Sequence, residues 1–116
     1  MTDQELLELA AKAAGIKIDK SQTNGSGIGN NGFDILGNVV LDWHNGTKWN
    51  PLEDDGDALR LAVKLKVSVE IENSGTVVFH GGNGKYAKTR CNLLDKEEAT
   101  RRAIVMAAAH IGQNMK

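Results

Sequence analysis

The sequence predicts an α+β fold, with helices packed on the faces of an antiparallel sheet of three to four strands in an alpha-beta-alpha sandwich. Three observations indicate this class: apolar residues recur at helical spacing in three segments, they alternate with polar residues in others, and short turn sequences join the strand-like segments. The 116 residues fit a single domain, residues 1–116, that is large enough to bury a core without a metal or a disulfide.

The first helix is expected over Asp3 to Ala14. Thr2 suits the N-cap position, and Glu5 three residues later completes a capping box. Gly15 is expected to end the helix. Its apolar residues stand three and four positions apart, at Leu6, Leu9, Ala10 and Ala13. Residues 19–32 are rich in Gly, Ser and Asn, which predicts a mobile loop.

Short strands are expected after this loop. Phe33 to Trp43 is β-like, and Gly37-Asn38 within it suits a tight turn between two strands. Asn45-Gly46 suits another turn, after which Thr47 to Trp49 would pair back. Asn50-Pro51 should end this strand, because proline has no N–H to donate.

The acidic run EDDGD precedes the second expected helix, Ala58 to Lys66. A calcium loop requires glutamate at its twelfth position, but the twelfth residue from Asp54 is Leu65. Asp57 can instead cap the helix, with Asp54 and Asp55 close to its positive end. We therefore interpret these three aspartates as helix-capping rather than metal-binding, and a catalytic carboxylate site remains the alternative.

A β-hairpin is expected next, with Val67 to Glu72 as a half-buried strand and Thr76 to His80 as its partner. A three-residue loop, Asn73 to Gly75, is preferred to a two-residue turn at Ser74-Gly75. The longer loop would gather four apolar side chains on one buried face: Val69, Ile71, Val77 and Phe79.

The last helix is expected to begin after Asp95, which would serve as its N-cap. Glu97 and Glu98 lie favourably in its first turn. Apolar residues follow at core spacing, at Ala103, Ile104, Ala107, Ala108 and Ile111. The small alanines permit close packing against a sheet.

Three segments carry a resemblance to a known family: WNPLEDDGDALRLAVKL, EATRRAIVMAAAHIG and ELLELAAKAAGI. They resemble the phage ABA-sandwich family of small bacteriophage and prophage proteins. The resemblance implies helices on both faces of a sheet. It implies no activity and no catalytic residues.

Composition and charge bound the function. Fourteen Lys and Arg against fifteen Asp and Glu give a net charge of −1, so no overall positive field attracts nucleic acid or an anionic membrane. The single cysteine, Cys91, indicates a reducing compartment. Because neither a signal pattern nor a membrane-span-length apolar run is found, we expect a protein of the bacterial host cytoplasm with no membrane partner.

Cofactor and metal motifs are not expected to function here. GIGNNG matches a dinucleotide-binding pattern but lacks the strand before it and the helix after it. GGNGKY lacks the first glycine and the Ser or Thr of a phosphate loop. The three histidines lack ligand spacing. We expect no cofactor and no metal.

The segment 85–102 is locally basic, with six Lys and Arg against three acidic residues. Its basic and aromatic residues could hold phosphates and stack a base. The alternative is a solvated helix face in which Glu97 and Glu98 pair with Arg101 and Arg102. The candidate phosphate-binding residues are Lys85, Tyr86, Lys88, Arg90, Arg101 and Arg102.

The two tryptophans flank the Asn45-Gly46 turn, and exposed there they would suit a protein interface formed by Trp43, His44 and Trp49. Core packing is the alternative. We therefore expect a phage-encoded accessory protein that binds an unknown host or phage protein without catalysis. Weak nucleic-acid binding through residues 85–102 and an enzyme using the carboxylates at 54–57 are the alternative functions.

Overall fold

The computed structural model describes residues 2–20, 32–34, 36–42, 44–82, 85–92 and 95–115, and for residues 80–82 and 85–88 it describes the backbone only. Within these residues the chain forms three helices and two antiparallel sheets, which confirms the α+β class. The elements in order are α1 Asp3–Ala14, β1 Val39–Asp42, β2 Thr47–Trp49, α2 Asp55–Leu65, β3 Ser68–Glu72, β4 Gly75–Gly82, β5 Lys85–Cys91 and α3 Lys96–Gln113.

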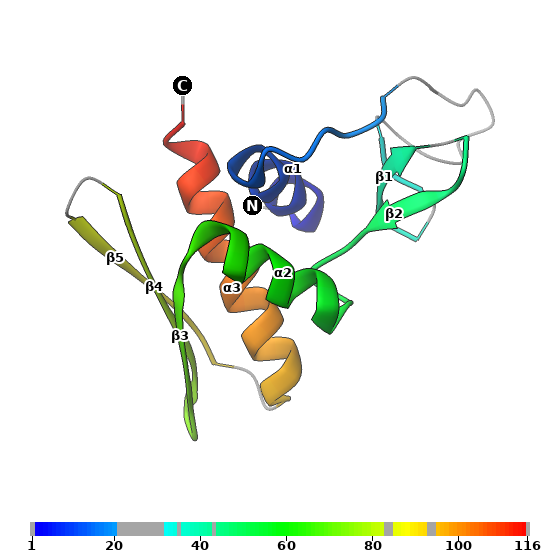
Figure 1. The fold of residues 1–116 in the computed structure, drawn as a ribbon. Coiled ribbons are helices and arrows are strands. Elements are labelled where there is room, and N and C mark those ends of the chain that lie inside the picture. Colours follow the sequence, from blue (N-terminus) through cyan, green and yellow to red (C-terminus); the bar gives the residue numbers. More distant parts are fainter. Residues whose placement is uncertain are drawn as a thin grey trace.

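The helices lie together between the two sheets, as Figure 1 shows. The three-stranded sheet, in the order β3-β4-β5, is on one side of them, and the β1-β2 hairpin is on the other. The strands expected in one sheet are thus divided between two. One face of the three-stranded sheet packs on α3, and no described helix covers the opposite face.

Helix α1 begins and ends as predicted. The N–H of Glu5 donates to Thr2 Oγ1 at 3.1 Å, and the Thr2 N–H donates back to the Glu5 carboxylate at 3.4 Å, which completes the capping box. Gly15 ends the helix in the left-handed conformation, with φ of 70°.

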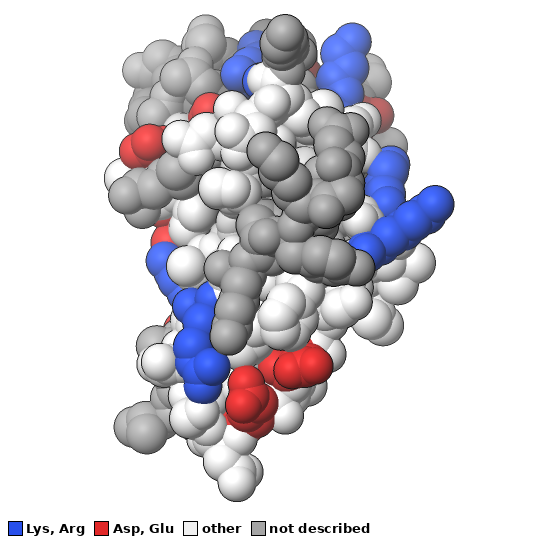
Figure 2. Space-filling view, turned by 90° about the vertical axis from the view of Figure 1, so that its left-hand side faces the viewer, with Lys and Arg blue, Asp and Glu red and all other residues white. Residues whose placement is uncertain are grey.

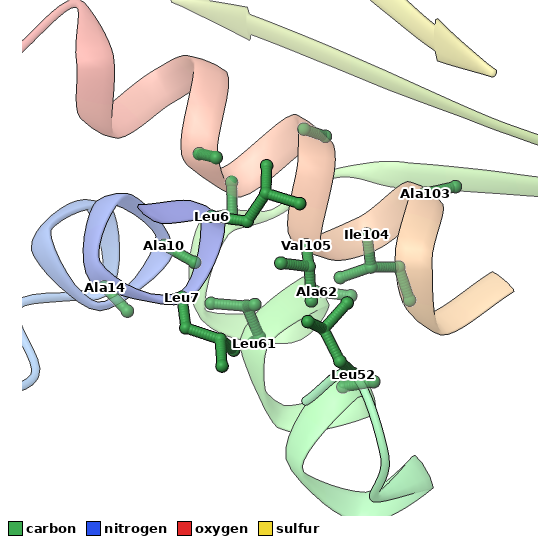
Figure 3. Packing of buried hydrophobic residues seen from close by; sticks show 14 of the residues in the cluster. Leu6, Leu7, Ala10, Ala14, Leu52, Leu61, Ala62, Ala103, Ile104 and Val105 are labelled. Carbon is green, nitrogen blue, oxygen red and sulfur yellow. The ribbon is translucent and has the colours of Figure 1, made fainter. Parts of the chain in front are cut away.

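The backbones of α1 and α3 meet at Gly112 of α3. A Cβ atom placed there would lie 2.0 Å from the backbone oxygen of Leu9. The neighbouring core consists of small and branched side chains from all three helices, including Leu6, Leu7 and Ala10 of α1, Leu61 and Ala62 of α2, and Ile104 and Val105 of α3 (Figure 3). Small residues along α3 therefore let the helices approach closely.

Asp95 caps α3 as predicted, and its side chain accepts hydrogen bonds from the N–H groups of Glu97 and Glu98. Thr100 of α3 shares a hydrogen bond of 2.8 Å with Thr76 of β4, joining the helix to the sheet. Among the described residues, no helix combines the length and the apolar character needed to cross a lipid bilayer.

Helix α2 begins three residues earlier than predicted, at Asp55 rather than Ala58. Its N-cap is Asp54, whose carboxylate accepts a hydrogen bond from the Asp57 N–H at 2.8 Å. The backbone oxygen of Asn50 accepts from the N–H groups of Glu53 and Asp54, so the chain is already turning before the helix starts. The prediction that Asp57 is the cap is therefore wrong.

The β1-β2 hairpin confirms that Thr47–Trp49 pairs back across the Asn45-Gly46 turn. Trp49 lies opposite Val39 in this pairing. The first of the two strands expected around Gly37 is reduced to a single bridge, between Phe33 and Val39. Most of the predicted loop, residues 21–31, lies outside the described residues.

The β3-β4 hairpin turns over two residues, Asn73 and Ser74, and not over the three that we expected. Glu72 is paired with Gly75, so Val77 lies opposite Glu70 and Val78 opposite Val69. Gly75 explains the position of the turn. It has φ of 146°, and a Cβ atom there would lie 2.2 Å from Asn92 Oδ1 and 2.6 Å from the Cys91 oxygen.

This register changes which apolar residues are buried. Thr76 and Val78 share the face that packs on α3, while Val77 is buried on the other face. Ile71, predicted to be buried, keeps 64% of its surface exposed at the edge of the sheet. Strand β4 is central, and β3 is an edge strand with mostly exposed residues.

Strand β5 was not predicted. Lys85–Cys91 pairs antiparallel with β4 from Gly82↔Lys85 to Thr76↔Cys91. Its sequence KYAKTRC alternates larger residues with Ala, Thr and Cys, which is a period-two signal. The high local charge obscured that signal.

Replacing Gly112 by alanine is expected to lower the free energy of unfolding by about 1–3 kcal/mol, because the new methyl group would overlap the Leu9 carbonyl. Gly56→Ala in α2 is the matched control. A Cβ there meets only the ends of the Arg60 and Asp54 side chains, so this change should be neutral or stabilising by up to about 1 kcal/mol. Urea unfolding measures the free energy of unfolding of both variants. Equal values for Gly112→Ala and Gly56→Ala would contradict the close contact of α1 and α3.

Candidate functional site

Arg101 joins α3 to the start of α2. Its Nη1 lies 2.6 Å from Asp55 Oδ1, and its Nε donates to the Leu52 oxygen at 2.9 Å. The hydrogen bond to Asp55 raises the pKa of the Arg101 guanidinium above its usual value. Only 16% of the Arg101 side chain is exposed, so its charge interacts with Asp55 inside the fold and is not presented to a ligand.

Arg102 joins α3 to α1 in the same way. Its Nη2 lies 2.7 Å from Asp3 Oδ1, and this hydrogen bond raises the pKa of the guanidinium. The arginines thus pair with acids on other helices, and the expected pairs with Glu97 and Glu98 are not what the structure shows. The reason is that both side chains point toward neighbouring helices instead of along α3.

Arg90 does not form a phosphate site together with Arg101 and Arg102, because it lies on a different face of the sheet. It stands opposite Val77, on the face of the sheet that lacks a helix, and its Nη1 lies 3.6 Å from Glu72 Oε1. Its Nε donates to Asn92 at 3.0 Å. The side chains of Lys85, Tyr86 and Lys88 lie outside the described residues. The basic segment is therefore divided between β5 and α3.

The aspartates at 54–57 do not converge on one point. Asp54 caps α2, and Asp55 pairs with Arg101. Asp57 accepts the Asn50 N–H at 2.9 Å and pairs with Arg60 at 2.8 Å. Each carboxylate has a structural partner. Within the described part of the chain, no group of three or more His, Cys, Asp or Glu residues is arranged to hold a metal ion.

Trp49 is not part of an exposed interface, and the alternative of core packing holds for this residue. Trp49 is 6% exposed and belongs to the hydrophobic core, because its position in β2 turns it inward opposite Val39. His44 is exposed, and its backbone N–H donates to Asp42 Oδ1 at 2.8 Å. Trp43 lies outside the described residues.

Asp34 is a half-buried carboxylate that sequence reasoning missed. It accepts hydrogen bonds from the N–H groups of Leu36 and Asn38 at 2.9 Å, and Lys48 Nζ lies 2.8 Å from it. Burial alone raises the pKa of Asp34, but the bonds from Lys48, Asn38 and Leu36 outweigh burial and lower the pKa to about 2. Through these hydrogen bonds and its ion pair with Lys48, Asp34 links the turn before β1 to strand β2.

Cys91 is a free, buried thiol on the α3 side of the sheet. Burial raises its pKa, and the nearby positive charge of Arg102 only partly opposes this. A thiol with a raised pKa is a poor nucleophile at neutral pH. Cys91 therefore serves as a core residue.

An apolar hollow of about 230 Å³ lies between β3, the first two turns of α3 and the start of α2. Its wall is almost wholly apolar, although it includes charged residues, because these contribute their hydrocarbon stems. The lining residues are Asp55, Ile71, Lys96, Glu97, Thr100 and Arg101.

Large apolar side chains are also exposed on α2, the helix whose first residue lines this hollow. Leu59 and Val63 of α2 are 64% and 67% exposed, and with Asp55 they are spaced four apart along one side of the helix. Since Asp55 lines the hollow together with Ile71, this row of side chains leads away from it. We call Leu59, Val63 and Ile71, with the hollow, the apolar surface.

A larger hollow, of about 630 Å³, is lined by Lys17, Ile18, Asp19, Lys20, Leu41 and Asp42. Its lining mixes both charges, and four of its six lining residues directly precede the undescribed residues 21–31 in the sequence. It therefore supports no site.

Comparisons with models of protein families, with curated proteins and with solved structures found no match. The resemblance to the phage ABA-sandwich family stays a prediction that rests on the three sequence segments.

Replacing Asp34 by asparagine is expected to lower the free energy of unfolding by about 1–2 kcal/mol at neutral pH, because the charged hydrogen bond to Lys48 is lost. The folded-state pKa of Asp34 is lowered to about 2 from 3.8, so the carboxylate stabilises the fold above the unfolded pKa. This contribution is lost as the pH falls toward 2. Urea unfolding of both proteins should show a difference that is constant near neutral pH and shrinks below about pH 4. A difference unchanged between pH 6 and pH 3 would contradict the role of Asp34.

Proposed function

We propose that this protein is a non-catalytic protein-binding module and that the apolar surface is where its partner binds. Three of the five large apolar residues that are most exposed in the described part of the chain belong to this surface, while Leu36 and Met115 lie elsewhere. Exposed apolar side chains gathered beside a hollow are typical of protein interaction sites.

The single observation that carries the proposal is the exposure of Ile71, which lines the apolar hollow. Fully burying an isoleucine side chain contributes roughly 1.5–3 kcal/mol. Because Ile71 is 64% exposed, a partner that covered it would gain the larger part of this free energy.

The alternatives have less support. Arg90, Arg101 and Arg102 are each paired with an acidic residue, which weakens a phosphate-binding role for residues 85–102. Enzyme action through Asp54, Asp55 and Asp57 would require carboxylates that face a common pocket, and these three have separate structural partners.

The biological setting is part of the proposal. A phage or prophage origin, with a host or phage protein as partner, rests on the resemblance alone. Cytoplasmic location is favoured by the single cysteine, which is a free thiol in the core.

The proposal is tested by selecting displayed random peptides against the wild-type protein. Enriched peptides are then measured against the triple variant Leu59→Ser, Val63→Ser, Ile71→Ser. We expect binding to the triple variant to weaken at least about tenfold, equivalent to about 1.4 kcal/mol, because the apolar contacts are lost. The matched control is Leu36→Ser with Met115→Ser, which removes exposed apolar groups elsewhere and should retain binding.

Failure to enrich any peptide, or equal binding to the triple variant, would contradict the proposed surface. Short single- and double-stranded oligonucleotides are included as competitors. Salt-sensitive displacement of the peptides by an oligonucleotide would favour the nucleic-acid alternative.

A further inference from the structure

The outer edge of β3 is open. In the sheet order β3-β4-β5, β3 has one neighbour, and its residues Ser68–Glu72 are exposed except for the half-buried Val69. Within the described part of the chain, no backbone hydrogen bond links β3 to anything other than β4. An open edge presents unpaired N–H and C=O groups that can pair with another strand.

The two faces of β3 differ in chemistry. Val69 and Ile71 lie on the face that packs on α3, because their partners in β4 are Val78 and Thr76. Glu70 and Glu72 lie on the opposite face, because successive side chains along a strand alternate between the two faces. The edge thus has an apolar side and an acidic side.

Figure 2 views the molecule from the side of this opposite sheet face and shows acidic side chains near one end of it. Glu72 lies 3.6 Å from Arg90, so part of its charge is neutralised. No ion pair of Glu70 is found among the described side chains. The acidic side of the edge therefore keeps a negative charge available to a partner.

The apolar side of the edge leads directly into the hollow. Ile71 lines it, together with Thr100 and Arg101 of α3. A strand placed beside β3 would direct alternate side chains to the two faces of the sheet. Those on the α3 side would stand next to Ile71 and the hollow, and those on the other side next to Glu70.

We propose that the partner binds through an extended segment that adds to β3 as a fourth strand of this sheet, with apolar and basic residues in alternation. An apolar side chain of the segment fills the hollow against Ile71, and a basic side chain pairs with Glu70. Main-chain hydrogen bonds supply affinity, and the two side-chain contacts supply specificity. This inference rests on the proposed function and names the chemistry of the partner.

A second copy of this chain suits the same edge less well than a basic segment, because its β3 carries the same two glutamates. In the antiparallel registers that align the centres of two β3 strands and continue both sheet faces, Glu70 would lie opposite Glu70 or Glu72 of the other copy. Like charges directly opposite one another destabilise a strand pair. A basic partner segment avoids this repulsion.

The test uses a synthetic peptide of alternating valine and lysine, capped at both ends, added to the isotopically labelled protein. Amide NMR shifts should centre on Ser68–Glu72, with slowed hydrogen exchange there. Two control peptides separate the contributions. Glutamate in place of lysine reverses the charge, and N-methylation of every residue removes the N–H donors on both edges of the peptide, so that it cannot pair as a strand. Both controls should bind at least about tenfold more weakly.

Protein variants test the two contacts. Glu70→Lys and Ile71→Ala are each expected to weaken the valine-lysine peptide about fivefold or more. Glu8→Lys on α1 and Leu36→Ala are the matched controls for charge and for apolar exposure, and should bind the peptide like the wild type.

Strand addition is overturned if the peptide produces no shifts on β3 at millimolar concentration, if the N-methylated or glutamate peptide binds equally well, or if sedimentation shows self-association through β3 instead. If displayed peptides still require the apolar surface while the valine-lysine peptide does not bind β3, the protein-binding function stands and strand addition fails. If neither binds, both proposals fail.

Discussion

The close packing of α1 on α3 is the constraint on which the rest of the structure depends. Gly112 allows the Leu9 carbonyl to approach the α3 backbone, and the fully buried Ala103 and Ala107 keep the rest of α3 narrow enough for neighbours on several sides. Helix α3 therefore contacts both other helices and the three-stranded sheet. Because so much of the core lies around one helix, β3 at the far edge of the sheet adds little to it and stays open.

The ion pairs of α3 fix how the other helices are oriented around it. Arg101 holds the start of α2 through Asp55, and Arg102 holds the start of α1 through Asp3. Since the two aspartates are largely exposed, each pair contributes at most about 1 kcal/mol, so these contacts set geometry more than stability. The same ion pairs neutralise Arg101 and Arg102, which the sequence suggested for phosphate binding. The apolar surface is therefore the stronger candidate for function.

Local signals predicted the fold well, while contacts between distant segments could not be read from the sequence. The Thr2 and Asp95 caps depend on neighbours within three residues, and both are confirmed. The turn at Asn73 and Ser74 depends on Gly75 meeting Asn92, and the exposure of Ile71 follows from that register. Such contacts join segments that only the folded chain brings together. For the same reason, the apolar surface could not be predicted from separate helix and strand patterns.

Native-state hydrogen exchange tests most directly whether α3 organises the molecule and leaves β3 open. The account predicts that the amides of Ala103 to Ala109 exchange only through global unfolding, with free energies equal to that measured by urea. The amides of Ser68–Glu72 should exchange through local opening, at clearly lower free energies. Exchange of the α3 amides by local opening, or protection of β3 equal to that of α3, would contradict the account.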